Sequence, residues 1–452
     1  MPTSTLEAPA ITASPVYTEL LKRLEARTAT IAVVGMGYVG LPLAVCVAKA
    51  GFKAIGFDIG EQRVAQLNKG ESYITDVTTE ELAPLVANGS VAATTDMSRL
   101  AEADVVVICV PTPLTPNQTP DITYIEATGR TIAQYLRPGQ LVTLESTTYP
   151  GTTEEVLQPL LETSGLTLGI DFFLAYSPER VDPGNERYTT HNTNKVLGGV
   201  TPACLQAAKT FYQSIIQNIV AVSSPGCAEM VKVFENTFRA VNIALVNELA
   251  LLCDPMNLNI WEVVEAAGTK PFGMMTFYPG PGVGGHCIPI DPFYLAWKAR
   301  EYKFQTRFIE LAGEINAGMP RFVREKVIRA LGKQRKSVAG STILLLGMAY
   351  KKDLGDWRDS PAVDVFEILQ GDDANVIYHD PYVPTMTDGN GQSHASVALT
   401  PDTLATVDCV VIVTDHTCVD TQWVVENSAL VVDTRNATKA ITGSLRDKIV
   451  LL

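Results

Sequence analysis

The chain has 452 residues, 46% of them hydrophobic and 19% charged, which is enough apolar material for two or three folded domains. Its formal net charge of −14 argues against non-specific binding to nucleic acid, and it means that an anionic ligand would need local cations or helix N-termini. No apolar run reaches the roughly 18 residues of a membrane-spanning helix.

The cysteines and histidines exclude further classes of protein. The eight cysteines include no CxxC pair, and the five histidines include no pair four residues apart, so neither a disulfide framework nor a structural metal is expected. Residues 1–15 lack the basic and apolar segments of a secretory signal. We therefore expect a reduced, cytoplasmic protein without a metal ion and without a membrane partner.

The first predicted elements follow the order of a dinucleotide-binding site. A buried parallel strand at residues 30–34 leads into the turn Gly35-Met36-Gly37-Tyr38-Val39-Gly40. A helix at residues 41–50 and a strand at residues 53–57 come next, and the second strand ends at Asp58. Strand, GxGxxG turn, helix, strand and acid in this order are typical of dinucleotide binding.

Each residue type in this unit has a physical role. Gly35 permits a tight turn, Gly37 lets a pyrophosphate approach the backbone, and Gly40 lets the helix pack closely on the sheet. Asp58 would accept hydrogen bonds from ribose hydroxyls and would repel a 2′-phosphate, which favours NAD over NADP. Arg63 weakens that preference, because it lies near enough in the sequence to meet a phosphate.

Strands and helices alternate up to residue 222 and predict a doubly wound α/β domain with a parallel sheet. Strands are expected at residues 104–110, 140–144, 172–176, 195–199 and 218–222, and helices at residues 79–87, 122–135, 153–161 and 202–214. Loops after the carboxyl ends of such strands should line the ligand crevice. These loops carry Pro111, Thr112, Thr147, Glu179 and Arg180.

A long helix is predicted at residues 226–253. Its second half is apolar nearly all round, so it should be buried, either in a subunit interface or in the core of one large domain. In its first half, Lys232 and Asn236 are four residues apart and share one face. That face serves a ligand or is an ordinary solvated polar surface.

Residues 278–294 predict a shaped loop that carries the main reactive side chain. Four glycines and two prolines precede Cys287, and Asp291 follows it four residues later. Glycine permits positive φ and close approach of a ligand, and proline removes backbone donors, so neither a helix nor a strand is expected. Cys287 is either a nucleophile or a small buried hydrophobe.

The last part of the chain predicts a helix, a basic linker and a smaller α/β domain. The helix covers residues 305–331, with Pro320 marking a bend or a break, and strands follow at residues 341–346, 375–378, 407–413 and 430–432. Gly347 follows the first of these strands, but the second glycine of a dinucleotide motif is missing, so no second dinucleotide site is expected. Lys351, Lys352, Arg358 and Arg435 lie near strand ends, where an anion would dock.

Three motifs in this order resemble those of the nucleotide-sugar 6-dehydrogenases of the UDP-glucose/GDP-mannose dehydrogenase family. They are the turn at residues 35–40, the loop Gly282-Val-Gly-Gly-His-Cys287, and Ala349-Tyr-Lys-Lys-Asp-Leu-Gly-Asp-Trp-Arg358. The resemblance implies two Rossmann-like doubly wound parallel-sheet domains joined by a long central helix and a helical dimerisation segment. The implied divisions are a tail and helix (1–28), an NAD-binding domain (29–222), the central segment with the cysteine loop (223–331) and a UDP-sugar-binding domain (332–452).

The family oxidises a sugar CH2OH group to a carboxylate, and the resemblance assigns roles by motif position. It implies Cys287 as the nucleophile, Lys232 as an oxyanion stabiliser, Asp291 with Asn236 as holders of a catalytic water, Glu179 as the acid for thioester hydrolysis, and Thr147 as the threonine of the Ser-Thr motif. The implied NAD contacts are Gly35, Gly37, Tyr38, Val39, Gly40, Asp58, Arg63, Pro111, Thr112 and Thr147. The implied UDP-sugar contacts are Glu179, Arg180, Lys232, Asn236, Arg239, Tyr278, Gly282, Gly284, Lys351 and Arg435.

The expected sugar substrate depends on individual residues within these motifs. Ile290 stands where the UDP-glucose enzymes carry a lysine, and residues 269–273 lack their arginine, which Arg239 is hypothesised to replace. The segments around Glu179, Asn236 and Cys287 are closer to the UDP-N-acetylglucosamine 6-dehydrogenases, whose uronic acid product serves surface polysaccharide of the O-antigen or capsule type. UDP-N-acetylmannosamine, UDP-N-acetylgalactosamine and UDP-glucose stay open as substrates, as does a non-enzymatic NAD-binding sensor or scaffold. The resemblance also implies a homodimer through the central helix.

Overall fold

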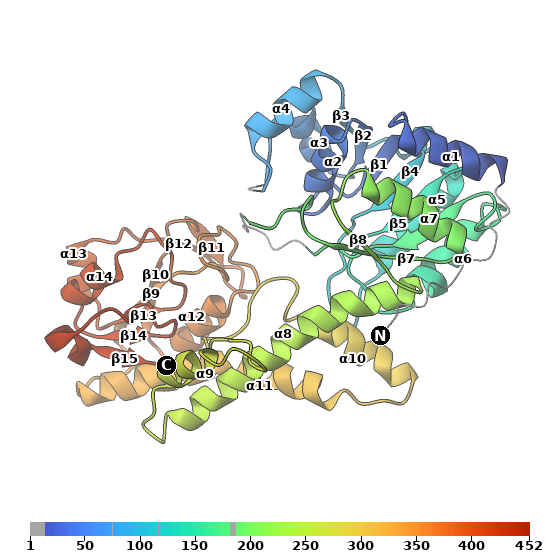
Figure 1. Ribbon diagram of the computed structural model, residues 1–452. Helices are drawn as coiled ribbons and strands as arrows, with labels where there is room; N and C mark the ends of the chain where they lie inside the picture. Colours follow the sequence, from blue (N-terminus) through green and yellow to red (C-terminus); the bar gives the residue numbers. More distant parts are fainter. Residues whose placement is uncertain (1–13, 75, 116, 181–186) are drawn as a thin grey trace. The chain divides into compact units, whose positions relative to one another are not determined.

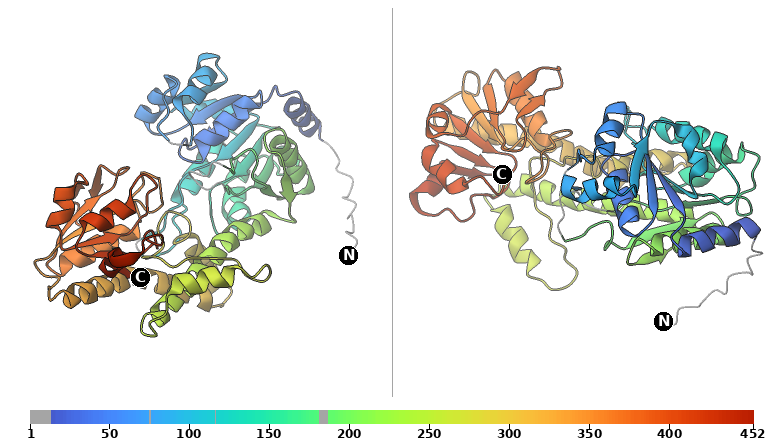
Figure 2. Two further views of the ribbon diagram at one scale, coloured as in Figure 1. Left: turned by 60° about the vertical axis from the view of Figure 1, so that its left-hand side comes forward. Right: turned by 90° about the horizontal axis from the view of Figure 1, so that it is seen from above.

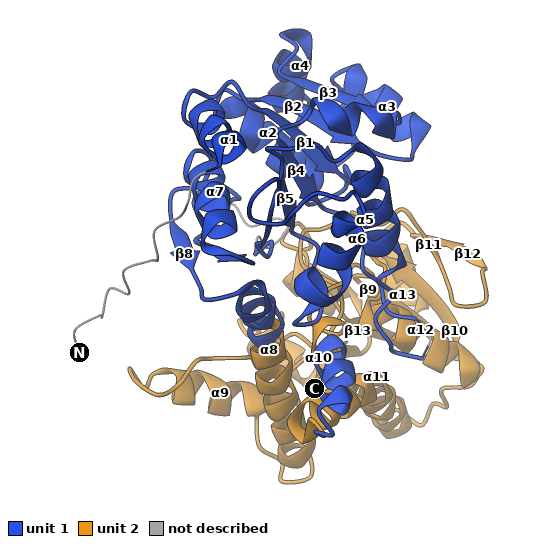
Figure 3. Cartoon of the chain, turned by 90° about the vertical axis from the view of Figure 1, so that its right-hand side faces the viewer, with its two compact units in different colours: residues 1–235, 293–304 blue, residues 236–292, 305–452 orange. Residues whose placement is uncertain are grey.

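The computed structural model describes residues 14–74, 76–115, 117–180 and 187–452, and it confirms the α/β fold class (Figure 1). Two compact units divide the chain (Figure 3): unit 1 is Met1–Glu235 with Phe293–Phe304, and unit 2 is Asn236–Pro292 with Gln305–Leu452. A disordered or loosely packed tail is expected at residues 1–14, and residues 1–13 of it lie outside the described residues. The expected domain boundaries stay a prediction.

Unit 1 contains a sheet in the order β3-β2-β1-β4-β5-β6-β7-β8. Its strands are β1 (Thr30–Val34), β2 (Lys53–Phe57), β3 (Val91–Thr94), β4 (Val105–Ile108), β5 (Leu141–Leu144), β6 (Phe173–Tyr176), β7 (Lys195–Gly199) and β8 (Ile219–Ala221). Strand β1 pairs in parallel with β2 on one side and with β4 on the other, so the strand order reverses at the carboxyl ends of β1 and β4. This reversal is where doubly wound sheets bind their ligands.

Two strands, β7 and β8, correct the expectation of an all-parallel sheet. Strand β7 pairs antiparallel with β6 through Ala175↔Gly199 and Tyr176↔Gly198, whereas β8 is parallel to β7. A parallel return needs a crossover, usually a helix, and the described residues between β6 and β7 contain none. Strand direction follows from that connection, which the composition of β7 does not reveal.

Helices cover both faces of the unit 1 sheet (Figure 2). They are α1 (Pro15–Glu25), α2 (Gly40–Lys49), α3 (Glu61–Asn68), α4 (Thr79–Ala87), η1 (Met97–Glu102), α5 (Thr123–Tyr135), η2 (Thr153–Leu157), α6 (Gln158–Glu162) and α7 (Pro202–Gln213). Alternate residues of β1 enter different cores: Ile31 and Val33 pack with α1, α2 and α7, and Ala32 and Val34 pack with α5 and α6. The single helix expected at residues 153–161 is instead a π-helical turn followed by α6.

The long helix α8 (Pro225–Cys253) forms where it was predicted and ends before Asp254 and Pro255. Its second half is only partly buried within the single chain, which argues against a core position for one face and leaves the subunit interface as a prediction. Leu245, Leu249 and Leu252 are 53%, 38% and 55% exposed, although Val246 and Ala250 between them are buried. One apolar face of this half is therefore packed in unit 2, and another apolar face is exposed.

Unit 2 contains a parallel sheet in the order β10-β9-β13-β14-β15 and a separate β11–β12 hairpin. The strands are β9 (Thr342–Leu346), β10 (Asn375–His379), β11 (Thr385–Thr387), β12 (Ser393–Ala395), β13 (Cys409–Ile412), β14 (Val431–Asp433) and β15 (Ile449–Leu451). Helices α11 (Arg307–Lys333) and α12 (Pro361–Gly371) pack on one face of the larger sheet, and α13 (Pro401–Thr406) and α14 (Thr421–Asn427) pack on the other. The strand β15 and the 3-10 helix η3 (Gly443–Lys448) before it were not predicted.

Three helices around the cysteine loop refine the predictions. Helix α9 (Ile260–Gly268) was not predicted, and Pro320 does not end α11, which continues through it. Helix α10 (Asp291–Glu301) begins inside the segment that was expected to be entirely loop. Asp291 and Pro292 suit this start, because a carboxylate and a proline are both favoured in the first turn of a helix. Within the described residues, no helix combines the length and the apolar character needed to cross a membrane.

Candidate active site

The backbone geometry of the glycine turn in unit 1 explains why glycine stands at Gly35 and Gly40. Gly35 has φ +94° and donates its N–H to the Phe57 carbonyl at 2.8 Å. A Cβ at Gly40 would lie 1.9 Å from the Gly35 carbonyl oxygen, so only glycine allows this helix–strand approach. A Cβ at Gly37 would meet nothing within 4 Å, which leaves the backbone open on the side where a phosphate would approach.

Asp58 closes the turn with a buried carboxylate. It accepts hydrogen bonds from the backbone N–H of Met36 at 3.0 Å and of Gly60 at 2.9 Å, and from the guanidinium of Arg63 at 2.8 Å. Burial acts to raise the pKa of Asp58, but these hydrogen bonds outweigh it and lower the pKa, so the group is an anion at neutral pH. An ionised acceptor at the end of β2 beside an open glycine turn fits a dinucleotide with a free ribose 2′-hydroxyl.

The other residues predicted to contact NAD lie at the same carboxyl edge of the unit 1 sheet. Tyr38 is exposed and Val39 is half-buried at the start of α2. Pro111 is exposed after β4, Thr147 is half-buried after β5, and the Thr112 carbonyl accepts a hydrogen bond from the hydroxyl of Tyr294. The fold thus brings to one edge of the sheet residues that are spread over more than a hundred positions of the sequence.

Glu179 lies in a buried ionic cluster that sequence reasoning missed. The Lys195 ammonium lies 3.4 Å from the Glu179 carboxylate and 2.9 Å from that of Glu145. The backbone N–H of Arg180 donates to Glu179 at 2.8 Å, and its guanidinium pairs with Glu235. The sequence does hold a signal for this cluster, because Lys195 and Glu145 are charged residues at the ends of strands that are otherwise apolar.

A second residue missed from the sequence holds the loop after β5. The buried carboxylate of Glu229, on α8, accepts hydrogen bonds from the N–H of Gly151 at 2.6 Å and from the N–H and hydroxyl of Thr153 at 2.9 and 2.6 Å. Glu229 therefore ties α8 to the chain just beyond the Ser-Thr segment that carries Thr147.

In unit 2, two of the predicted catalytic residues are in direct contact. The Asn236 carboxamide donates to the Asp291 carboxylate at 2.5 Å, and the Arg239 guanidinium donates to the Asn236 oxygen at 3.0 Å. Asn236 and Asp291 are both buried. Lys232 is buried one helical turn before Asn236 on α8.

The cysteine loop joins this pair directly. Cys287 is exposed, and its carbonyl accepts the N–H groups of Ile290 at 3.1 Å and of Asp291 at 2.9 Å. This turn leads into α10, so the start of the helix fixes the thiol-bearing residue relative to the Asp291 carboxylate. A polar pair at the end of a loop that carries an exposed thiol can hold a water molecule and accept a proton while sulfur acts as a nucleophile.

The loop glycines have a packing role within unit 2. A Cβ at Gly282, which has φ +137°, would lie 2.8 Å from the Pro361 side chain, and one at Gly284 would lie 2.7 Å from the Asp359 carbonyl oxygen. A Cβ at Gly285 would lie 2.8 Å from the Tyr350 ring. Because glycine has no side chain, the backbone of the cysteine loop can pack closely against residues 350–361. Whether Gly282 and Gly284 also contact a sugar stays a prediction.

His286 ties the same two segments together. Its ring nitrogens lie 3.1 Å from the carboxylates of Asp356 and Asp359. Hydrogen bonds to these aspartates raise the pKa of His286 to about 9, so the ring is an imidazolium at neutral pH.

The residues predicted to bind UDP sit around the same loop. Arg435 is half-buried, and its guanidinium donates to the Val413 carbonyl at 2.8 Å. A Cβ at Gly280 would lie 2.8 Å from this guanidinium. Lys351 is half-buried after β9, and the Tyr278 ring stacks on Trp261 with centroids 5.8 Å apart. Lys352 and Arg358 pair with Asp415 and Asp356 respectively.

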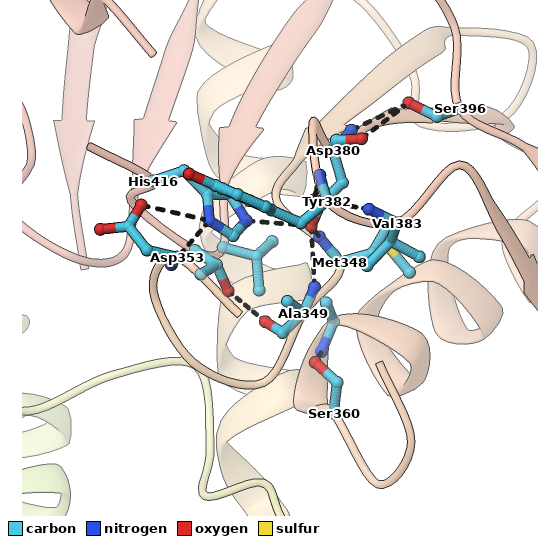
Figure 4. Close-up of polar contacts among 12 residues, drawn as sticks. Met348, Ala349, Asp353, Ser360, Asp380, Tyr382, Val383, Ser396 and His416 are labelled. Carbon is cyan, nitrogen blue, oxygen red and sulfur yellow. Dashed lines mark hydrogen bonds and ion pairs between the residues drawn. The ribbon is translucent and has the colours of Figure 1, made fainter. Parts of the chain in front are cut away.

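The turn that begins at Gly347, after β9, resembles the first glycine turn, but a histidine of unit 2 bonds to the carboxylate that closes it (Figure 4). Asp380 follows β10 as Asp58 follows β2, and it accepts the N–H groups of Met348 at 2.7 Å and of Ala349 at 2.9 Å. His416 donates to the same carboxylate oxygen at 3.0 Å. Asp380 is therefore already bonded by two backbone N–H groups and by His416. The expectation that unit 2 binds no dinucleotide stays a prediction. Across the described residues, no group of three or more His, Cys, Asp or Glu side chains is placed to hold a metal ion.

The comparisons with known proteins cover each segment of this site. Residues 29–216, 227–318 and 344–440 match the NAD-binding, central and UDP-binding domains of the UDP-glucose/GDP-mannose dehydrogenase family. A UDP-N-acetyl-D-mannosamine dehydrogenase of Pyrococcus horikoshii is 37% identical over 387 residues, which is 85% of this chain and 89% of that protein.

Two further relatives are named after other sugars. A UDP-N-acetyl-D-glucosamine 6-dehydrogenase of Pseudomonas aeruginosa is 38% identical over 355 residues, 78% of this chain and 83% of that protein. The crystal structure of an NDP-N-acetyl-D-galactosaminuronic acid dehydrogenase from Methanosarcina mazei is 30% identical and superposes with a TM-score of 0.79 over 96% of this chain and 97% of that one. The chain therefore belongs to the UDP-glucose/GDP-mannose dehydrogenase family, and it is an NAD-dependent oxidoreductase of the nucleotide-sugar 6-dehydrogenase class.

Proposed function

We propose that this enzyme oxidises the C6 hydroxyl of UDP-N-acetyl-D-glucosamine to the uronic acid. The balanced reaction is R–CH2OH + 2 NAD+ + H2O → R–COO− + 2 NADH + 3 H+. The observation that carries the proposal is the contact between Asn236 and Asp291, whose backbone N–H bonds to the carbonyl of Cys287. This arrangement offers a proton acceptor and a nucleophile at one short segment of chain.

The protein groups have separate tasks in this reaction. NAD+, held at the turn of residues 35–40, supplies the hydride acceptor. Asp291 and Asn236 hold the water that takes the proton from the C6 hydroxyl, and the Cys287 thiolate adds to the resulting aldehyde so that it cannot leave. The Lys232 ammonium and the Asn236 carboxamide stabilise the negative charge that develops on oxygen. Loss of a second hydride from the thiohemiacetal carbon to another NAD+ would give the thioester. Water activated by Glu179 then releases the acid from the thioester, and Thr147 contacts the cofactor and the reacting group.

Substrate recognition is assigned to unit 2 and to the loop after β6. Lys351 and Arg435 would bind the UDP diphosphate or uridine, with the backbone of Gly282 and Gly284, while Tyr278, Arg180 and Arg239 would contact the sugar. Local cations are needed because the chain carries a net charge of −14 and the substrate is an anion. The product is a precursor for surface polysaccharide in this proposal.

The N-acetylglucosamine assignment rests on the wording of three segments, and a mannosamine relative of similar identity makes UDP-N-acetylmannosamine the second candidate. UDP-N-acetylgalactosamine and UDP-glucose are further candidates, since a few pocket contacts decide between epimers. An assay of all four UDP-sugars with NAD+ and NADP+ separates these readings. We expect the highest kcat/KM with UDP-N-acetylglucosamine and two NADH for each sugar consumed.

The role of Cys287 has its own test. Cys287→Ala should reduce uronate formation by about 1,000-fold or more, because no other group can tether the aldehyde. The matched control is Cys418→Ala, which removes another exposed thiol and should leave the rate unchanged. One NADH per sugar, or full uronate output from Cys287→Ala, would sink the proposal, and no NAD+ reduction with any sugar would favour a sensor or scaffold.

A further inference from the structure

The ionic cluster around Lys195 is almost closed to solvent. The side chains of Lys195, Glu145 and Glu179 are 5%, 0% and 16% exposed. The ammonium lies between the two carboxylates, and the hydroxyl of Tyr212 donates to the far oxygen of Glu145 at 2.6 Å. Of these four residues, the function proposed above uses only Glu179.

The antiparallel strand β7 explains how the cluster forms. Glu145 directly follows β5 and Glu179 follows β6 by three residues, so both lie at the carboxyl edge of the sheet. Because β7 runs against β6, its first residue, Lys195, reaches that same edge. A parallel β7 would carry Lys195 to the opposite edge, so the strand reversal is what brings the cation to Glu179.

The charges of the cluster suit a positioning role. Burial acts to lower the pKa of Lys195, but the carboxylates of Glu145 and Glu179 outweigh it and raise the pKa, so Lys195 stays an ammonium. Replacing a buried ion pair by apolar side chains is often neutral for stability, so packing alone does not demand this cluster. Buried ionisable clusters at a sheet's ligand-binding edge are frequent in active sites.

We propose that Lys195 is a positioning residue that aims the Glu179 carboxylate for thioester hydrolysis, with Glu145 and Tyr212 holding the ammonium in place. This inference rests on the proposed function of Glu179. In the step itself, a water oxygen forms a bond to the acyl carbon while Glu179 takes a water proton. The carbon–sulfur bond then breaks, the acid leaves, and the Cys287 sulfur departs as a thiolate that can recover that proton.

The test compares Lys195→Met with Glu179→Gln. Both should lower steady-state kcat about 10- to 100-fold, the range expected when a catalytic group is misplaced by about 1 Å. The kcat/KM for the UDP-sugar should change less than about threefold, because hydrolysis follows the oxidation steps. Both should also accumulate a covalent acyl adduct on Cys287, detected by intact mass after acid quench. Hydroxylamine, which attacks thioesters without a general base, should speed turnover of both variants more than that of the wild type.

Three further variants separate positioning from folding. Lys195→Arg keeps the cation and should restore kcat to within about tenfold of the wild type. The double variant Glu145→Gln/Lys195→Met removes one buried charge of each sign, which is better tolerated than removing one, and it should accumulate the same adduct. Arg137→Met breaks one of the two ion pairs of the buried Asp104, at the amino end of β4 and so at the opposite edge of this sheet, and it should show no adduct.

The outcomes distinguish this inference from the proposed function. If Glu179→Gln stalls with an adduct while Lys195→Met and the double variant turn over without one, Lys195 has no positioning role and the role of Glu179 stands. If Glu179→Gln itself turns over at the wild-type rate, the role of Glu179 falls and the inference falls with it. The Cys287→Ala experiment judges the covalent mechanism independently of both results.

Discussion

Asp58 and Arg63 form an ion pair beside the dinucleotide turn, and this pair bears on the choice of cofactor. The sequence alone suggested that Arg63 would moderate the preference for NAD by meeting a phosphate. In the structure its guanidinium is held by Asp58 at 2.8 Å and lies over the Tyr73 ring, 5.7 Å from the centroid. Arg63 is therefore engaged by the carboxylate that would reject a 2′-phosphate.

Removing the Asp58 carboxylate should weaken the binding of NAD+ and improve the use of NADP+. In Asp58→Ala we expect the KM for NAD+ to rise about 10-fold or more, because a charge-assisted hydrogen bond to ribose is lost. The released Arg63 should raise kcat/KM for NADP+, measured by NADPH absorbance. Asp58→Ala/Arg63→Ala is the control and should lose the gain with NADP+. Unchanged cofactor ratios in Asp58→Ala would mean that this carboxylate does not contact the ribose.

His286 gives a pH-dependent link between the cysteine loop and residues 350–361. Asp356 and Asp359 raise its pKa from 6.5 to about 9, while Arg358 acts in the opposite direction. A raised histidine pKa stabilises the fold fully below pH 6.5, and this contribution is lost as the pH rises through 9. The ring is 42% exposed, so solvent screening limits its size.

The matching experiment is a series of thermal melts of the wild type and His286→Gln at several pH values. The wild type should have the higher Tm below pH 6.5, and the difference should shrink across the interval from 6.5 to 9. Asp359→Asn removes one partner, so it should move the loss of stability to lower pH. A difference in Tm that is constant with pH would show that the imidazolium is not the stabilising species.

At the scale of elements, α8 organises the chemistry through buried polar contacts along its length. Glu229 holds the loop of Gly151 and Thr153 in unit 1, and Asn236 meets Asp291 in unit 2. A helix positions such groups well, because its own backbone bonds leave them few alternatives. The loop held by Glu229 follows the Ser-Thr segment that carries Thr147.

Glu229→Gln tests this anchoring. The two carboxylate oxygens accept three donors, whereas a carboxamide offers one oxygen and would turn its N–H2 toward a donor. We expect a loss of about 1–3 kcal/mol in the free energy of unfolding, measured by urea titration. Glu19→Gln, at an exposed position of α1 in the same unit, should change stability by less than about 0.5 kcal/mol. Equal effects of the two substitutions would rule out the anchor.

For the whole molecule, the open face of α8 points to self-association. Leu245, Leu249 and Leu252 are spaced by four and three residues, so they lie on one side of the helix, and each is at least 38% exposed. A contiguous apolar surface of this kind usually marks an interaction site. We propose a homodimer with this face buried between two copies of the chain.

Sedimentation analysis can decide the oligomeric state. Leu245→Glu/Leu249→Glu places charges on the proposed interface, so it should shift the protein from dimer to monomer. Ile170→Glu is the control, because Ile170 is a 55% exposed side chain in unit 1 and its replacement should leave the dimer intact. A wild type that sediments as a monomer at micromolar concentration would contradict the proposal.

The amino-acid sequence by itself determined the features that depend on near neighbours. The turn from Gly35 to Asp58, the boundaries of β1, β2 and β7, the course of α8 and the glycine content of the cysteine loop follow from periodicity and backbone preference over short spans. The family resemblance also comes from such local motifs, and the comparisons bear it out.

Only the tertiary structure decided which distant groups meet. The direction of β7 brings Lys195 to Glu145, which lies 50 positions earlier, and packing brings Asn236 to Asp291 across 55 positions. It also left part of the apolar half of α8 exposed within the single chain, where the sequence could not separate a subunit interface from a core helix. Local patterns specify what each segment can form, but contacts between segments depend on the path of the whole chain, because burial and charge pairing are satisfied only once distant segments pack together.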